Sequence, residues 1–260
     1  MLSLEQRGIL DREVDQQILE GRVDFAVHNM KEIPLVDRAT RLMVASVMER
    51  GSPAEALVSR DDRKLKDLPR GSRVGTSSPI RVAQLRHSRP DLKPEPLWGE
   101  IEKRVERVDH GDVDATILAE AGLARLGLAH RISERLPIEE FMPAPGQGAL
   151  AIVARRDNLK VIETLRTVEH LPSRLEVDAE RELVRILEGS SKVPVGGLAS
   201  ARGDRIQITA CILSIDGREK HVATRSGNTV DGVTLAREAA EELVAKGAIR
   251  IGETWRTGQR

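Results

Sequence analysis

Aromatic residues are almost missing from this sequence of 260 residues: they make up 2% of it, and tyrosine does not occur. Because proteins that hold single-stranded nucleic acid stack its bases on aromatic side chains, that class of function is not expected. An excess of charge is missing too, since 41 Lys and Arg residues balance 41 Asp and Glu residues. A chain without net charge has no overall field that would attract DNA or an anionic membrane. Neither a nucleic acid nor a membrane is therefore an expected partner.

Cysteine and long hydrophobic runs are scarce as well. The single cysteine, Cys211, can form neither an intramolecular disulfide nor a metal site of several thiolates, which fits a reducing compartment. The six histidines show no metal-binding spacing, so no metal is expected. The longest largely apolar run, Leu42–Met48, is far shorter than the roughly 20 residues of a membrane-spanning helix. The first residues, Met1–Gln17, carry acids and are unlike a signal peptide. We expect a cytoplasmic protein.

Strand and helix patterns alternate through the first two thirds of the chain. Such alternation is typical of a doubly wound, largely parallel α/β sheet, and the chain is long enough for two or three domains. Buried strands are expected at Val23–Asn29, Leu42–Met48, Arg73–Gly75, Ala115–Ala119 and Leu150–Ala154. Helices are expected at Leu10–Ile18, Pro79–His87, Glu100–His110, Glu120–Leu126, Asn158–Val168 and Arg174–Leu187.

The last part of the chain has a different pattern. Alternating strands are expected near Gly197–Ala201, Arg205–Leu213 and Lys220–Thr224, with turn residues between them. A helix at Thr234–Ala245 follows. This pattern indicates a small α+β module.

The segment His28–Pro34 is the first candidate site. A strand ends here and releases Lys31 and Glu32 into a loop at its carboxyl end. Ligands of open α/β sheets bind at that edge, so Glu32 is a candidate acid beside a small, carboxylate-rich ligand. The alternative interpretation is a solvated loop with an ordinary surface ion pair.

The segment Gly75–Arg81 is the second candidate. A strand leads into a helix through Thr76, Ser77 and Ser78, and the N–H groups and dipole of a helix N-terminus favour an anion there. Simple helix capping by these hydroxyl residues is the alternative. Arg81, in the first turn of the helix, favours anion binding.

Arg104 and Arg125 are candidates for a carboxylate-binding role, because the planar guanidinium grips a carboxylate with two hydrogen bonds. The alternative is that each is an ordinary surface arginine. The turn Gly146–Ala149 is expected where the chain crosses between domains and carries no dinucleotide-binding pattern. Cys211 lies in a strand pattern and is expected to be buried and inert.

The loop Glu188–Pro194 contains Ser191. No general base stands beside this serine in the sequence, so serine catalysis is not indicated.

In this order and spacing, the segments resemble the hydroxymethylbilane synthase family, also called porphobilinogen deaminase. The resemblance runs from about Arg7 to Ile251, and five segments carry it most clearly: Val23–Pro34, Arg73–Arg81, Asp112–Leu128, Pro145–Ile152 and Glu188–Gly196. It implies two α/β domains like those of periplasmic binding proteins and a small C-terminal α+β domain. Domain 1 is then expected at 1–50 and 146–168, domain 2 at 51–145 and domain 3 at 169–260.

The resemblance also implies an activity. The family joins four porphobilinogen units head to tail, with loss of ammonia, on a dipyrromethane cofactor that a loop cysteine holds by a thioether. A loop Asp stabilises the positive charge that develops on the pyrrole nitrogens, and the matching residue here is Glu32. The family's ligand-binding residues match Lys31, Thr76, Ser77, Ser78, Arg81, Arg104 and Arg125, and its cofactor cysteine matches Ser191.

Several positions depart from the family pattern. Glu32 is longer than Asp by one methylene, and a misplacement of about 1 Å can cost about 10²-fold in rate. Because a serine oxygen is a weak nucleophile, covalent attachment of the dipyrromethane at Ser191 is not expected. Ile80 and Trp98 stand where the family has arginines. The family's first strand and helix have no counterpart, so a second copy or a partner chain would have to cover the sheet edge.

Two functions fit these observations. One is a hydroxymethylbilane synthase of tetrapyrrole biosynthesis that retains its cofactor in an unusual way. The other is a paralogue that binds a pyrrole or another small polycarboxylate without polymerising it.

Overall fold

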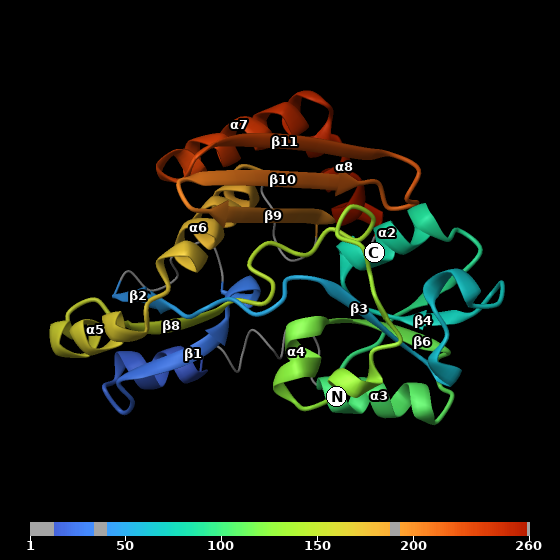
Figure 1. The fold of residues 1–260 in the computed structure, drawn as a ribbon, viewed down its shortest axis with the longest axis horizontal. Helices are drawn as coiled ribbons and strands as arrows, with labels where there is room; N and C mark the ends of the chain where they lie inside the picture. Colours follow the sequence, from blue (N-terminus) through green and yellow to red (C-terminus); the bar gives the residue numbers. More distant parts are fainter. Residues whose placement is uncertain (1–12, 34–40, 188–192, 259–260) are drawn as a thin grey trace.

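The computed structural model describes residues 13–33, 41–187 and 193–258. Three small sheets, each with its own helices, make up this part of the chain (Figure 1). No described helix is long and apolar enough to cross a membrane.

The first sheet has three strands, in the order β1 (Phe25–Asn29), β8 (Leu150–Arg155) and β2 (Leu42–Val47), and both pairings are antiparallel. Helix α5 (Leu159–Leu165) packs its apolar residues on one face of β2 and β8. The helical residues 13–19 cover the other face through Ile18, because this side chain contacts Leu42 and Val153.

The second sheet is inserted between β2 and β8 and is mixed. Its strand order is β5-β4-β6-β3-β7, with β4 parallel to β5 and β6, and β3 antiparallel to β6 and β7. The strands are β3 (Glu55–Ser59), β4 (Arg73–Gly75), β5 (Lys93–Glu95), β6 (Ala115–Ala119) and β7 (Glu134–Arg135). The helices are α2 (Pro79–Ser88), α3 (Ile101–Asp109) and α4 (Glu120–Arg125).

The third sheet is an antiparallel meander of β9 (Val195–Arg202), β10 (Arg205–Leu213) and β11 (Lys220–Asn228). Helices α6 (Leu171–Ile186) and α7 (Gly232–Ala245) contact this sheet and each other, and α8 (Ala248–Gly258) follows them. Ala, Leu, Val and Ile side chains of these elements form the largest apolar core among the described residues. Short 3-10 turns lie at Met30–Glu32, Arg60–Asp62, Leu65–Asp67, Ala129–Arg131, Arg166–Val168 and Thr229–Asp231.

The predicted fold class, α/β followed by a small α+β module, is confirmed. Each sheet lies within one of the three ranges predicted as domains, whose exact boundaries stay predictions. The expectation of a largely parallel sheet is wrong, because among the described strands only the pairings of β4 with β5 and β6 are parallel. Alternation of strands and helices does not encode strand direction, and the sequence pattern missed β3, which runs antiparallel to its neighbours. Strands β5 and β7 and helix α8 were missed as well.

The expectation that Val23–Asn29 is a buried strand is also wrong. Among the described residues, β1 pairs only with β8 and therefore forms a sheet edge. Phe25 and Val27 on this strand are 46% and 50% exposed. The predicted second copy or partner chain at this edge stays a prediction.

Candidate active site at the crossover

Two segments carry the chain between the first and second sheets, at 48–54 and 143–149, and together we call them the crossover. They run side by side, since the N–H of Gly51 donates to the carbonyl of Gly148 at 3.1 Å. Gly148 has a φ of +85°, and a Cβ atom there would lie 2.6 Å from the carbonyl oxygen of Gly51. Only glycine fits at this close approach of two backbones. The predicted turn at Gly146–Ala149 thus lies where the chain crosses between sheets.

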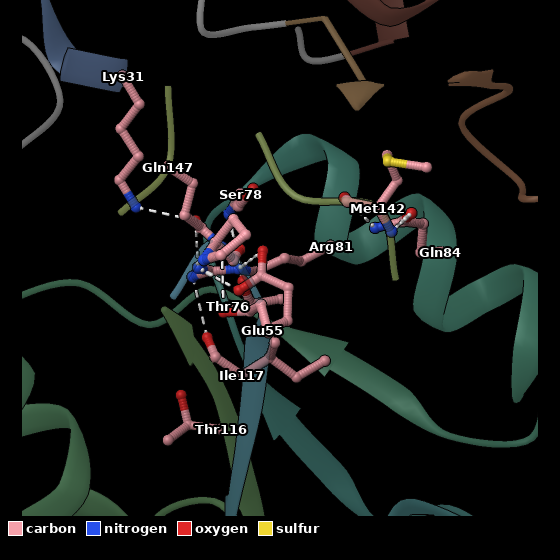
Figure 2. A network of polar contacts seen from close by, with 12 residues as sticks. Lys31, Glu55, Thr76, Ser78, Arg81, Gln84, Thr116, Ile117, Met142 and Gln147 are labelled. Atoms are coloured by element: carbon pink, nitrogen blue, oxygen red, sulfur yellow. Dashed lines mark hydrogen bonds and ion pairs between the residues drawn. The ribbon is translucent and has the colours of Figure 1, made fainter. Parts of the chain in front are cut away.

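Lys31 and Glu32 follow β1 directly and form the short 3-10 turn at its carboxyl end. The Glu32 carboxylate is exposed and accepts a hydrogen bond from the side-chain amide of Asn29 at 3.2 Å. The Lys31 ammonium points toward the crossover and donates to Oε1 of Gln147 at 3.1 Å (Figure 2). The loop therefore presents an acid to solvent and a cation to the crossover.

Arg81 is buried rather than presented to a ligand. Its guanidinium forms a two-pronged ion pair with the fully buried Glu55, with Nε and Nη2 at 2.8 and 2.7 Å from the two carboxylate oxygens. It also donates to the carbonyl of Ile117 at 3.0 Å and to Oε1 of Gln147 at 3.3 Å (Figure 2). These contacts give Arg81 a place inside the second sheet, and its predicted role in anion binding stays a prediction.

The hydroxyl residues before α2 shape the turn that leads into the helix. Thr76 is buried, and its hydroxyl accepts a hydrogen bond from the N–H of Ser78 at 3.3 Å. The Ser77 hydroxyl both donates to and accepts from the backbone of Leu97, at 3.1 and 3.0 Å. Ser78 occupies the cap position of α2, but its side chain makes no capping hydrogen bond. Of these three hydroxyl groups, that of Ser78 thus makes the fewest hydrogen bonds within the described residues.

Arg104 and Arg125 lie on α3 and α4, and each donates a hydrogen bond to a backbone carbonyl. Nε of Arg104 donates to the carbonyl of Gly99 at 2.7 Å. Nη2 of Arg125 donates to the carbonyl of Gly148 at 2.6 Å, so this exposed arginine rests on the crossover itself. Arg104 is close enough to Lys31 for its charge to act on the lysine ammonium. The structure thus gathers Lys31, Glu32, Arg104 and Arg125 around one region.

Comparison with known proteins identifies the family of this chain. Residues 1–163 match the model of the porphobilinogen deaminase dipyrromethane cofactor binding domain, and residues 174–248 match that of the porphobilinogen deaminase C-terminal domain. The chain belongs to the porphobilinogen deaminase family. It is 40% identical over 258 residues to the porphobilinogen deaminase of Desulforudis audaxviator, covering 99% of this chain and 83% of that one.

A second family relative is the probable porphobilinogen deaminase of Methanothermobacter thermautotrophicus, at 41% identity over 243 residues, 94% of this chain and 83% of that one. A solved periplasmic sulfonate-binding protein of Methylobacillus flagellatus is similar at 14% identity, with a TM-score of 0.37 over 65% of this chain and 50% of that one.

The family's cofactor-holding cysteine has no available substitute among the described residues. Ser191, at the matching position, lies outside them. Cys211 is completely buried in β10, and a Cβ atom added at Gly196 would lie only 2.8 Å from its sulfur. Burial raises the pKa of the Cys211 thiol to about 11, so it carries no reactive thiolate near neutral pH. The prediction that this cysteine is buried is confirmed, and its inertness stays a prediction.

The pKa of Lys31 is lowered from 10.5 to about 8, first by loss of water around the ammonium and then by the positive charge of Arg81. Glu55 and Glu32 oppose this shift, and Arg104 adds to it. The side chain as a whole is exposed, but its ammonium ends beside the buried amide of Gln147. A lysine poised near pH 8 holds its charge at neutral pH and loses it under mildly alkaline conditions.

Several residues that support the site were not found from the sequence. Glu55 neutralises Arg81, and Gln147 joins Arg81 to Lys31. Arg50, in the crossover, forms a buried ion pair with Glu180 of α6, at 2.6 and 3.0 Å. None of these pairs lies close in sequence, so no spacing pattern could have indicated them.

Proposed function

We propose that the chain is a cytoplasmic hydroxymethylbilane synthase, which condenses porphobilinogen with release of ammonia. The observation that carries the proposal is the exposed Glu32 at the end of β1, next to Lys31, whose ammonium contacts the same crossover as Arg125. An acid next to a lysine, in a region that also carries arginines, suits a substrate that is anionic at its side chains and becomes cationic at its ring.

The cations bind the substrate's side chains. Each porphobilinogen carries an acetate and a propionate group, so several cationic side chains are needed for a growing chain of pyrroles. Lys31, Arg104 and Arg125 supply them in this proposal, with Ser78 as a hydroxyl donor. Hydrogen bonds from charged donors to carboxylates are shorter and stronger than neutral ones.

Glu32 acts on the reacting centre. The bond between the aminomethyl carbon and nitrogen breaks, ammonia leaves, and an electron-poor azafulvene with positive charge at the pyrrole nitrogen remains. The free α carbon of another pyrrole then attacks the methylene carbon of the azafulvene to form the new carbon–carbon bond, and it releases its proton to water or to the departed ammonia. A fixed carboxylate stabilises the positive charge in the transition state, and such electrostatic effects are commonly worth a factor of about 10²–10³ in rate.

The family cofactor fits this chain only in part. Lys31, Arg104 and Arg125 would hold the carboxylates of a dipyrromethane. A thioether does not fit, because the matching position is Ser191 and the single cysteine, Cys211, is buried. We therefore propose that any dipyrromethane is held without a covalent bond.

The test is to incubate the purified chain with porphobilinogen, identify the product by mass spectrometry and record the intact mass of the protein. We expect a bilane product and an unchanged protein mass. The variant Ser191→Cys is the comparison, and we expect its mass to increase by that of a dipyrromethane. Binding of porphobilinogen without consumption, in both proteins, would overturn the proposal in favour of a binding protein.

The affinity for porphobilinogen should depend on pH through Lys31. Because the lysine pKa lies at about 8, the ammonium is charged below pH 8 and neutral above it. A carboxylate ligand favours the charged form, so the affinity should fall as the pH rises through 8. We expect a fall of about tenfold, because that corresponds to the loss of one hydrogen bond from a charged group. Calorimetry between neutral and alkaline pH measures this. Lys31→Met should bind more weakly and show no such fall; an equal fall in the variant would contradict the assignment.

A further inference from the structure

Gln147 lies at the centre of a polar network that joins the first sheet to the second (Figure 2). Its side chain is completely buried. Oε1 accepts hydrogen bonds from Nζ of Lys31 at 3.1 Å and from Nη2 of Arg81 at 3.3 Å. Nε2 donates to the backbone carbonyls of Pro53 and Ala54, at 2.9 and 3.5 Å.

These four contacts fix the orientation of the amide. A flipped amide would place its NH₂ group against two cations and its oxygen against two carbonyls, so every contact would become repulsive. The negative end of the amide dipole therefore faces Lys31 and Arg81. The side chain satisfies two positive groups while carrying no charge itself.

The backbone around Gln147 is fixed as well. The N–H of Gly146 donates to the buried Glu180 carboxylate at 2.5 Å, and Nε of Arg50 donates to the carbonyl of Gln147 at 2.9 Å. Gly146 has a φ of +79°, and a Cβ atom there would lie 3.1 Å from the backbone nitrogen of Lys31. The turn that carries Gln147 thus touches the loop that carries Lys31, and the amide cannot move away from the ammonium without moving the crossover.

The two cations on the amide differ in one respect. Arg81 is already neutralised by the two-pronged contact with Glu55. The Lys31 ammonium has only the neutral amide oxygen of Gln147 as a hydrogen-bond acceptor among its described contacts. The charged groups that act on Lys31 are Glu32 beside it, Glu55 on β3, Arg81 on α2 and Arg104 on α3.

We propose that Gln147 is a positioning residue, which holds the Lys31 ammonium at the substrate carboxylate without neutralising it. A glutamate at this position would form an ion pair with Lys31 and compete with the ligand. An apolar residue would leave the ammonium without an acceptor. The neutral amide fixes the direction of the lysine and leaves its charge for the ligand. This inference rests on the proposed role of Lys31 in binding substrate carboxylates.

The test compares Gln147→Glu and Gln147→Leu by two readouts. The first is the affinity for porphobilinogen at pH 7, which we expect to fall about tenfold or more in each variant, since each loses one well-placed charged contact. The second is the titration of Lys31 without ligand, followed by the pH dependence of its acetylation by acetic anhydride and peptide mass spectrometry. In Gln147→Glu, the carboxylate beside the ammonium should raise the midpoint of the Lys31 titration by about one pH unit or more. In Gln147→Leu, this midpoint should not rise.

The matched control is Lys31→Met, in which Gln147→Glu should cause no further loss of affinity. An unchanged affinity and an unchanged Lys31 midpoint in Gln147→Glu would overturn the inference. So would an equal loss of affinity on adding Gln147→Glu to Lys31→Met, because this would indicate a general structural role. If Gln147→Glu does not fold, the affinity for porphobilinogen is compared instead for Gln147→Leu alone and for Gln147→Leu combined with Lys31→Met. The Lys31 titration needs no turnover, so it can succeed even where the proposed activity fails.

Discussion

Glu32→Gln is expected to lower the rate of porphobilinogen consumption by at least about a hundredfold, with little change in affinity. The substitution keeps the size of the side chain and an oxygen that can accept the hydrogen bond from Asn29. It removes the negative charge. In the proposed mechanism this charge stabilises only the transition state, in which positive charge develops on the pyrrole. Loss of an interaction made only in the transition state lowers kcat and kcat/KM together.

Steady-state kinetics at pH 7 measures this effect. Glu32→Asp is the first control, because it keeps the charge and should retain measurable turnover. Glu20→Gln is the second, since Glu20 is an exposed carboxylate that contacts Gln16 and Arg22 instead of the crossover. A Glu32→Gln rate close to that of the unaltered chain would mean that another group stabilises the charge.

Glu55→Ala is expected to lower the free energy of unfolding by about 3–5 kcal/mol, because it leaves the Arg81 guanidinium buried without its counter-charge. For a chain of this size, such a change lowers Tm by roughly 10 °C. Thermal unfolding followed by circular dichroism measures it. The double variant Glu55→Met with Arg81→Met should be less affected than Glu55→Ala, since no buried charge then remains.

The matched control for this pair is Glu106→Ala, which removes the exposed contact between Lys103 and Glu106 at 2.8 Å. Exposed ion pairs are worth little, so the expected change is within about 1 kcal/mol. Equal stability of Glu55→Ala and Glu106→Ala would show that Arg81 can leave its buried place. In that case Arg81 would again be a candidate for gripping the ligand directly.

For Arg81, the sequence predicts the local structure but not the partner of the side chain. Its place in the first turn after three hydroxyl residues indicates anion binding, and the turn and helix lie where that pattern predicts them. The anion it meets, however, is the carboxylate of Glu55, on a strand that the pattern did not indicate. Which carboxylate meets a given arginine depends on how strands are ordered in the sheet, and one sequence does not specify that order.

The turn of Lys31 and Glu32 was predictable from the sequence, whereas the contacts of Gln147 were not. Lys31 and Glu32 were found from the sequence because they follow a strand directly, and this local feature is kept in the fold. Gln147 stood in a turn that was expected, but its partners Lys31 and Arg81 are 116 and 66 residues away. The candidate site residues could be named from the resemblance to a family. The contacts that set their charge and orientation could be seen only in the structure.

The measurement that tests the account most directly is the amount of ammonium that the purified chain releases from porphobilinogen. We expect one ammonium for each porphobilinogen consumed, and a total that exceeds the number of protein chains many times over. We also expect that Glu32→Gln releases almost none in the same time. Porphobilinogen that binds to the unaltered chain with no release of ammonium would contradict the account.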